Sequence, residues 1–380
     1  MPGRNSLPQR SHAHRVTGDG VNAAVADLPE AAGTAPHPTG WSRLPLEPVV
    51  NVALVGAGTI GAFHAQTLAQ RLPAATLVGV ADAIPATAER VAAAVGCERA
   101  TADYGSLLGD PDVDAVVIAT PPAFHGEVIE AAARAGKAIF CEKPITETLE
   151  QADRALAAVR QAGVPLQIGF QRRFDAGFAR AHALALSGAL GRPLLLRSIT
   201  RDPPAPDPRP FPGGSIFRDT LVHDFDVLRW LAGAEPRQVY AVAAALNEPF
   251  ASAGAYDTAL VTIQFENGAL ATADSSFWAV YGYDVRAEIQ GTIGMVTVGA
   301  ERAHSATLHD RAGSHADRAF WFVEVFRDAY VAELSAFVDC VRARTPPSCT
   351  GADGRAALLM ALAAMRSVEL GRPVDVSELG

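Results

Sequence analysis

Residues 49–61 read VVNVALVGAGTIG, a short apolar run that leads directly into the glycine-rich sequence Gly56–Gly61. A short run that is apolar almost throughout predicts a strand buried in a parallel sheet. The spacing G-x-G-x-x-G after such a strand is typical of a dinucleotide-binding turn. Its first glycine permits the tight turn, its second lets the backbone approach a pyrophosphate, and its third lets helix and strand pack closely. The stretch therefore predicts a strand, a turn and a helix N-terminus that faces phosphate.

Beyond this stretch, short apolar runs alternate with helical patterns up to residue 169. This alternation predicts an α/β Rossmann domain over residues 49–170, in which a doubly wound parallel sheet carries helices on both faces. The expected strands are 49–55, 76–81, 115–119, 138–141 and 166–169, and the expected helices are 61–70, 86–95, 125–135 and 149–162.

Residues that follow these strands predict a cofactor site, because ligands bind at the carboxyl ends of strands in open α/β sheets. Asp82 ends the second strand, 21 residues past Gly61, where a carboxylate would hold ribose hydroxyls and repel a 2′-phosphate, so NAD is favoured over NADP. Thr120-Pro121-Pro122 should line the nicotinamide side; for the nearby His125, a helix-cap or surface role is the alternative. The predicted cofactor-binding residues are Gly56, Gly58, Thr59, Ile60, Gly61, Asp82, Thr120, Pro121, Pro122, His125, Glu142 and Lys143.

The second half of the chain has several strand-like runs without helices between them. This predicts an α+β domain over residues 171–376 with an open, mainly antiparallel sheet, and a last helix that can pack back on the Rossmann domain. Asn267-Gly268 predicts a hairpin turn. Residues 1–48 lack periodicity and are expected to be a disordered extension. The other expected elements are helices 176–186, 219–231, 324–344 and 355–370, strands 194–200, 238–244, 259–265, 269–277, 284–290 and 295–298, and a Pro-rich loop at 202–214.

Composition narrows the class of protein. The net charge of −9, from 41 acidic and 32 basic residues, argues against sequence-independent nucleic-acid binding, and no apolar run is long enough to span a bilayer. The four cysteines are too few and too scattered for a disulfide framework or a metal-ligand cluster, so we expect a cytoplasmic protein with reduced thiols and no metal. Lys137 and Lys143 are the only lysines, which suggests that a retained lysine does what a guanidinium cannot.

Two motifs carry candidate catalytic groups. Glu142-Lys143-Pro144 follows a parallel strand, so the Lys143 ammonium can hydrogen-bond a substrate hydroxyl at the cofactor edge of the sheet and stabilise developing negative charge. The alternative is a surface lysine at a strand end, which is what we expect for Lys137. Asp219 and His223 are spaced i, i+4 at the start of a helix, where a carboxylate orients an imidazole and raises its pKa for acid–base catalysis. The alternative for this pair is a helix cap with a local ion pair.

The combination of Gly56–Gly61, Glu142-Lys143-Pro144 and residues 219–224 (DTLVHD) resembles the glucose–fructose oxidoreductase / inositol dehydrogenase (Gfo/Idh/MocA) family over residues 49–376. The resemblance implies a catalytic triad of Lys143, Asp219 and His223. In it the histidine is the acid–base, the lysine orients the substrate hydroxyl and the aspartate supports both. It also implies a cis Lys–Pro peptide, and a C-terminal sheet that joins subunits into a dimer or tetramer.

Within that family, residues 169–175, 200–203 and 281–284 look most similar to inositol 2-dehydrogenases. For the arginines and Tyr283 taken singly, a solvated or packing role is the alternative. The substrate-binding residues that the resemblance implies are Lys143, Gln171, Arg172, Asp202, Asp219, Thr220, His223 and Tyr283.

The resulting expectation is NAD-dependent oxidation of a secondary hydroxyl of a cyclic polyol, with conversion of myo-inositol to 2-keto-myo-inositol as the leading reaction. It requires that Lys143 and His223, from distant parts of the chain, meet beside the nicotinamide. Three alternatives remain open. The first is a dehydrogenase for another inositol isomer or a pyranose, the second an NAD-dependent glycoside hydrolase, and the third a non-catalytic NAD-binding protein.

Overall fold

The computed structural model describes residues 49–204, 215–299, 306–311 and 313–379. These described residues form one compact unit. The expected extension, residues 1–48, and most of the expected Pro-rich loop, residues 205–214, lie outside the described residues. Among the helices described, none has both the length and the apolar character that a membrane crossing requires.

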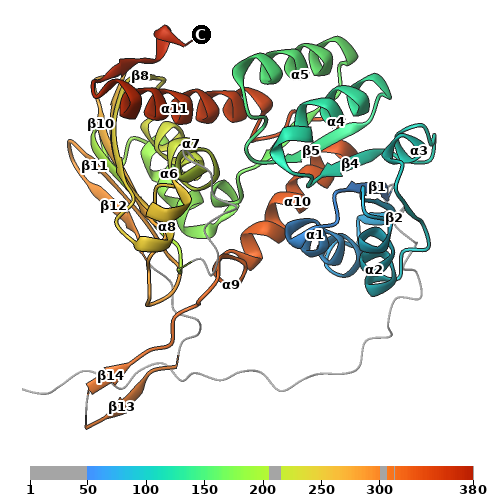
Figure 1. Cartoon of the computed structure of the whole chain (residues 1–380), viewed down its shortest axis with the longest axis horizontal. Coiled ribbons are helices and arrows are strands. Elements are labelled where there is room, and N and C mark those ends of the chain that lie inside the picture. Colours follow the sequence, from blue (N-terminus) through green and yellow to red (C-terminus); the bar gives the residue numbers. More distant parts are fainter. Residues whose placement is uncertain (1–48, 205–214, 300–305, 312, 380) are drawn as a thin grey trace, which may run out of the picture. The chain divides into compact units, whose positions relative to one another are not determined.

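The first sheet is parallel throughout, and its six strands have the order β3-β2-β1-β4-β5-β6. Figure 1 labels β1, β2, β4 and β5 of this sheet. The order reverses between β1 and β4, and this is the point at which doubly wound sheets bind ligands. Every residue of β4 and β5 is buried, because helices cover both faces of the sheet. The strands are β1 (Val50–Val55), β2 (Ala75–Ala81), β3 (Ala100–Thr101), β4 (Ala115–Ile118), β5 (Ala138–Glu142) and β6 (Leu166–Gly169).

The helices of this half lie close to their expected positions. Helix α4 begins at Pro122, three residues before its expected start, because a proline in the first turn has a helical φ and lacks only an N–H that would be unpaired there. Strand β3 and helix α3 were not expected, since both are too short to show a periodic pattern. The helices are α1 (Thr59–Gln70), α2 (Pro85–Val95), α3 (Tyr104–Leu108), α4 (Pro122–Arg134) and α5 (Leu149–Ala162).

The second sheet has seven strands in the order β12-β11-β7-β10-β9-β8-β15. Its neighbouring strands are antiparallel except for β7 and β10, which run parallel, so the expected mainly antiparallel sheet is confirmed. Asn267-Gly268 forms the expected turn between β9 and β10, with Gly268 at a φ of +84°. The strands are β7 (Pro193–Arg201), β8 (Pro236–Ala244), β9 (Thr258–Phe265), β10 (Leu270–Ser276), β11 (Asp284–Gly291), β12 (Met295–Val298) and β15 (Val374–Asp375).

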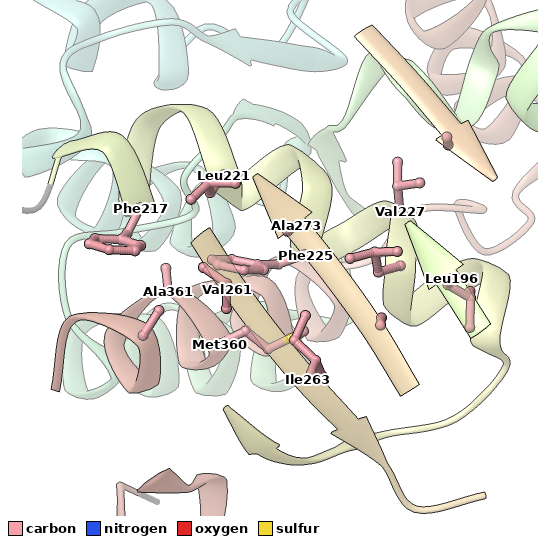
Figure 2. Close-up of a cluster of buried hydrophobic side chains, with 14 of the residues drawn as sticks. Leu196, Phe217, Leu221, Phe225, Val227, Val261, Ile263, Ala273, Met360 and Ala361 are labelled. Atoms are coloured by element: carbon pink, nitrogen blue, oxygen red, sulfur yellow. The ribbon is translucent and has the colours of Figure 1, made fainter. Parts of the chain in front are cut away.

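Helices α6 (Ala176–Leu186), α7 (Leu221–Ala232) and α11 (Gly351–Leu370) bury their apolar residues in the core of the second sheet. Figure 2 shows Phe225 of α7 among Val261 and Ile263 of β9 and Met360 of α11. The helix expected over 219–231 is in two parts, because a π-helical turn at Ile216–Thr220 precedes α7.

The last two long helices also pack against the first sheet. Helix α10 (Arg327–Ala343) contributes Leu334 and Phe337 to the core on one face of that sheet. Helix α11 contributes Leu358 to the core on the other face and Met360 to the core of the second sheet. The remaining elements described are α8 (Glu248–Ala253), α9 (Phe322–Val325), the hairpin of β13 (Leu308–Asp310) and β14 (Gly313–His315), and two short 3-10 helices at Gln171–Phe174 and Val376–Glu378.

Candidate active site

The glycine-rich turn connects β1 to α1. A Cβ on Gly56, whose φ is +96°, would lie 2.5 Å from the backbone of Ala119, and one on Gly61 would lie 2.0 Å from the carbonyl oxygen of Gly56. Apart from its chain neighbours, no atom of the described residues would lie within 4 Å of a Cβ on Gly58, and none of their side chains caps the first N–H groups of α1. Two of the glycines are therefore required by the close packing of this turn, and the third leaves open space in front of a helix N-terminus, as a bound pyrophosphate needs.

Asp82 lies beside this turn, just after β2. Its Oδ2 accepts a hydrogen bond from the N–H of Ala57 at 2.8 Å, and its Oδ1 accepts one from the N–H of Ile84 at 2.9 Å. Each carboxylate oxygen has a second lone pair, so both can still accept a hydrogen bond from a ribose hydroxyl. The turn and Asp82 together fit the adenosine and pyrophosphate parts of a dinucleotide.

The loop after β4 joins the turn on the same edge of the sheet. The hydroxyl of Thr120 is buried and has no hydrogen-bond partner among the described residues. His125 is fully buried in α4, with Nδ1 2.7 Å from the Pro144 carbonyl oxygen and Nε2 2.8 Å from the Thr120 carbonyl oxygen. The surface role considered for His125 is therefore wrong. Its buried ring bridges the carbonyl oxygens of Thr120 and Pro144 and so connects the two loops. Burial lowers the pKa of this imidazole.

Lys143 and Asp219 are 76 residues apart in the chain and are in direct contact. The Nζ of Lys143 donates to the backbone carbonyl oxygen and to the Oδ1 of Asp219, each at 2.8 Å. Lys143 follows β5 and Asp219 lies in the π-helical turn before α7, so this contact joins the carboxyl edge of the first sheet to a helix that packs on the second sheet. The Lys143–Pro144 peptide is cis. Lys143 exposes 18% of its side chain and Asp219 54%, so the pair lies at an accessible surface.

The other lysine was expected at the surface, and that expectation is wrong. Lys137 is buried, and its Nζ donates to the carbonyl oxygens of Asp110 and Val113, each at 2.7 Å. A compact ammonium satisfies both acceptors just before the start of β5.

His223 lies in the first turn of α7 and is 8% exposed. Asp219 makes no hydrogen bond to it within the described part of the chain, and its Nδ1 has no partner there. Burial, followed by the positive charges of Lys143 and Arg172, holds the pKa of His223 well below its usual range, whereas we expected Asp219 to raise it. The π-helical turn breaks the i, i+4 spacing of an α-helix, and the carboxylate of Asp219 binds Lys143 instead. His223 is therefore neutral at neutral pH and can accept a proton.

A buried polar network lies behind these groups. Arg172 is 1% exposed, and its guanidinium donates to the Oδ1 of Asp224 at 3.1 Å and to the hydroxyl of Thr200 at 2.9 Å. Asp224 is fully buried and also accepts from the hydroxyl of Ser198. Asp224 was part of the recognised motif but was given no role. A carboxylate among the apolar residues of α7 is the signal that could have identified it, because a buried charge needs a partner.

The remaining predicted substrate residues contribute polar atoms to the same region. Gln171, Thr220 and Tyr283 are buried, and the Oε1 of Gln171 has no partner among the described residues. Asp202 follows β7, and its Oδ2 is likewise unpartnered within the described residues. Burial and then the charge of Asp219 raise the pKa of Asp202 to about 7. Buried polar atoms without partners are groups that a polyhydroxyl ligand can satisfy.

One group among the described residues has the composition of a metal site. Single ligand atoms of His64, Glu142 and Glu333 lie within 4.8 Å of one another, and all three residues are buried. The Nε2 of His64 and the Oε1 of Glu142 are 2.7 Å apart, which is a hydrogen-bond distance. Neither His64 nor Glu333 was singled out in the sequence.

The first sheet is doubly wound and has a dinucleotide turn, and at its carboxyl edge the ammonium of Lys143 lies beside the neutral imidazole of His223. Together these features define a nucleotide-dependent dehydrogenase as the class of this protein. A family model described as "Oxidoreductase family, NAD-binding Rossmann fold" matches residues 50–170, and a model of the GFO/IDH/MocA C-terminal domain matches residues 178–297. The chain belongs to the Gfo/Idh/MocA oxidoreductase family, and it is an oxidoreductase that acts on a CH–OH group.

Similar proteins share almost their full length with this chain. The scyllo-inositol 2-dehydrogenase (NAD(+)) of Bacillus subtilis is 39% identical, over 87% of this chain and 97% of that protein. The myo-inositol 2-dehydrogenase of Thermotoga maritima is 36% identical, over 87% of this chain and 99% of that protein. The solved structure of scyllo-inositol dehydrogenase from Lactobacillus casei with bound NAD(H) and scyllo-inositol has a TM-score of 0.82 at 30% identity, over 87% of this chain and 99% of that chain.

The glycines of the turn offer a matched pair of variants. Gly61→Ala places a Cβ against backbone that cannot move aside, so we expect a loss of unfolding free energy on the order of 2–4 kcal/mol. Gly58→Ala places a Cβ in open space at a φ of −65°, which alanine adopts freely, so stability should stay within about 0.5 kcal/mol. Its methyl group would occupy the pyrophosphate space and weaken NAD binding by about ten-fold or more. Denaturant unfolding and calorimetric titration measure both effects, and normal NAD binding by Gly58→Ala would contradict the assignment.

The pKa of Asp202 has a direct spectroscopic consequence. With a pKa of about 7, its carboxyl group is protonated in mild acid and ionised in mild base, unlike an ordinary exposed aspartate. In protein labelled at the aspartate carboxyl carbon, we expect one resonance to titrate between about pH 6 and 8. That resonance should be missing from Asp202→Asn. If it persists in the variant, or if no resonance titrates in this window, the raised pKa is wrong.

Proposed function

We propose that this protein oxidises a secondary hydroxyl of an inositol, with myo-inositol giving 2-keto-myo-inositol as the leading reaction and NAD⁺ as the oxidant. The observation that carries the proposal is the contact of the Lys143 ammonium with Asp219, 2.8 Å in length, at the carboxyl edge of the parallel sheet and beside a neutral His223. The relatives that act on inositols by name support the substrate class.

The roles of the three residues follow from their protonation and contacts. His223 is neutral and has a ring nitrogen without a partner among the described residues, and it accepts the proton of the substrate hydroxyl. The ammonium of Lys143 donates a hydrogen bond to the same oxygen and stabilises the negative charge that develops as the proton leaves. Asp219 positions Lys143 through its carbonyl and carboxylate oxygens. A nicotinamide bound at this edge supplies the acceptor for the hydride of the carbinol carbon, so the products are a ketone, NADH and a proton.

The preference for NAD over NADP rests on Asp82. Its carboxylate is held beside the glycine-rich turn by the N–H groups of Ala57 and Ile84, where the ribose of a bound dinucleotide would lie. The carboxylate can accept hydrogen bonds from the 2′- and 3′-hydroxyls. It would repel the 2′-phosphate of NADP.

The polar groups around Lys143 support a substrate that carries a hydroxyl on every ring carbon. Arg172, Asp202 and Tyr283 interact electrostatically with one another, and Asp202 also interacts with Lys143 and Asp219. Donors and acceptors distributed in this way suit several hydroxyls better than one anionic group. Gln171 and Thr220 complete the substrate-binding set of the proposal.

Two other readings use the same site. Oxidation of scyllo-inositol, another inositol isomer or a pyranose needs only a different arrangement of hydroxyls, and the similar proteins include enzymes named for myo- and for scyllo-inositol. Glycoside cleavage driven by a transient oxidation would use the same base and ammonium but release no net NADH. The predictions of a cytoplasmic location and of a homo-oligomer formed through the C-terminal sheet stay predictions.

A substrate panel tests the reaction. We expect purified protein to reduce NAD⁺ with myo-inositol at a kcat/KM at least about ten-fold above that with glucose, and with NAD⁺ at least about ten-fold above NADP⁺. The panel contains myo-, scyllo- and chiro-inositol, glucose, and an aryl glycoside without added cofactor, followed at 340 nm or by aglycone release. A higher kcat/KM with scyllo-inositol than with myo-inositol would show that scyllo-inositol is the preferred isomer. Aglycone release without NADH would show that the protein is a glycoside hydrolase and would reject the dehydrogenase proposal.

Substitution of the proposed catalytic groups tests their roles. We expect Lys143→Met and His223→Asn each to lower kcat by at least about 10²-fold while NAD still binds, because each removes a group that acts in the transition state. Lys137→Met is the matched control. It removes the chain's other lysine, whose contacts are structural. It should therefore lower the melting temperature while kcat changes little. Full kcat in either of the first two variants would reject the assigned role.

A further inference from the structure

A chain of contacts runs from the cofactor helix to the catalytic lysine through buried polar groups. His64 lies on α1, the helix that begins at the glycine-rich turn, and it is fully buried. Its Nε2 lies 2.7 Å from the Oε1 of Glu142, the last residue of β5. The Oε2 of Glu142 accepts the backbone N–H of Lys143 at 3.2 Å. One carboxylate therefore contacts both His64 and the peptide that carries the catalytic ammonium.

The surroundings confine this carboxylate. The rings of Phe140 and Tyr330 lie edge-on to His64 at centroid distances of 5.5 and 6.1 Å. On the other side, a Cβ built on Gly169 of β6 would lie 3.2 Å from the carboxyl group of Glu142. Glu142 is only 6% exposed, so loss of the His64 hydrogen bond would leave an oxygen of a nearly buried carboxylate unsatisfied.

Glu333 of α10 faces the same cluster. It is fully buried, and neither of its carboxyl oxygens has a hydrogen-bond partner among the described residues. Burial and then the charge of Glu142 raise the pKa of Glu333 well above its usual range, which favours the neutral form of this carboxyl group. A neutral Glu333 does not compete with the Glu142 carboxylate for His64 or for the Lys143 amide.

We propose that His64 and Glu142 form a positioning pair, which fixes the Lys143 peptide relative to the cofactor helix so that the ammonium reaches both Asp219 and the substrate oxygen. His64 acts through Glu142 and contacts no reacting atom. The geometry of Lys143 is sensitive to such support, because its Nζ must stay within hydrogen-bond distance of two oxygens on another element. A displacement of about 1 Å at a reacting group can cost on the order of 10²-fold in rate.

The first experiment needs no catalysis, so it does not depend on the proposed function. Because the chain has only two lysines, protein labelled at the lysine ε-carbon should give two signals, and Lys143→Met assigns them. We expect His64→Leu to shift the Lys143 signal and leave the Lys137 signal in place. His64→Gln, whose amide nitrogen can occupy the position of Nε2, should bring the Lys143 signal back toward its original position. An unmoved Lys143 signal in folded His64→Leu would overturn the proposal.

The kinetic arm rests on the proposed function and uses a double-mutant cycle. We expect His64→Leu to lower kcat at saturating NAD⁺ by about ten-fold or more, with NAD affinity changed by less than about three-fold, and His64→Gln to recover most of kcat. In the Lys143→Met background the same leucine substitution should change kcat by less than about two-fold, because the group it positions is gone. His182→Leu, on α6, is the matched control and should change neither.

Each other outcome is decisive. Equal losses of kcat with and without Lys143, or a loss of NAD affinity at unchanged kcat, would show that His64 acts on α1 alone and would reject the pair. A stoichiometric divalent metal in the purified protein, lost in His64→Leu, would replace the positioning pair with a metal site. If the parent protein oxidises no member of the substrate panel, the proposed function fails, and the lysine signals still decide the positioning role.

Discussion

The contact of Lys143 with Asp219 is the interaction on which the site depends. It crosses from the carboxyl end of β5 to the π-helical turn before α7, and each of its two hydrogen bonds measures 2.8 Å. Neither half of the chain holds a complete site alone, because the lysine comes from the parallel sheet and the aspartate and histidine come from the half that contains the second sheet. In the proposed function, this contact holds the ammonium between the cofactor edge and the polar residues of the second half.

Burial sets the protonation states around that contact. His223 is kept neutral by its apolar surroundings and by the positive charges of Lys143 and Arg172. Arg172 in turn keeps its charge because the buried carboxylate of Asp224 lies against it. The region thus holds a neutral imidazole and two cationic side chains, Lys143 and Arg172. In the proposed oxidation, the imidazole would accept the hydroxyl proton while the positive charges favour the negative charge that develops on the oxygen.

Much of this arrangement could be predicted from the sequence where local pattern and chemistry coincide. The glycine spacing and Asp82 predicted the turn and its neighbour, and alternating apolar runs predicted both sheets. Contacts between distant residues could not be predicted in the same way. The i, i+4 spacing suggested that Asp219 binds His223, but Asp219 lies in a π-helical turn that ends at Thr220, and its carboxylate binds Lys143 instead. Lys137 looked like a surface residue because nothing local shows that two carbonyl oxygens lie around its ammonium. His64 and Glu333 went unnoticed because only the fold brings them close to Glu142, from which both are distant in the sequence.

Helix α11 carries a consequence for how the chain is made. Its residues enter the cores of both sheets, with Leu358 in the first and Met360 in the second. During synthesis, therefore, neither core can be finished until residues 351–370 have left the ribosome, even though the first sheet is complete in sequence by Gly169. Until then the nascent chain exposes apolar surface on both halves. In the folded protein the unfolding of the two cores is therefore coupled, because detaching this one helix would open both cores together.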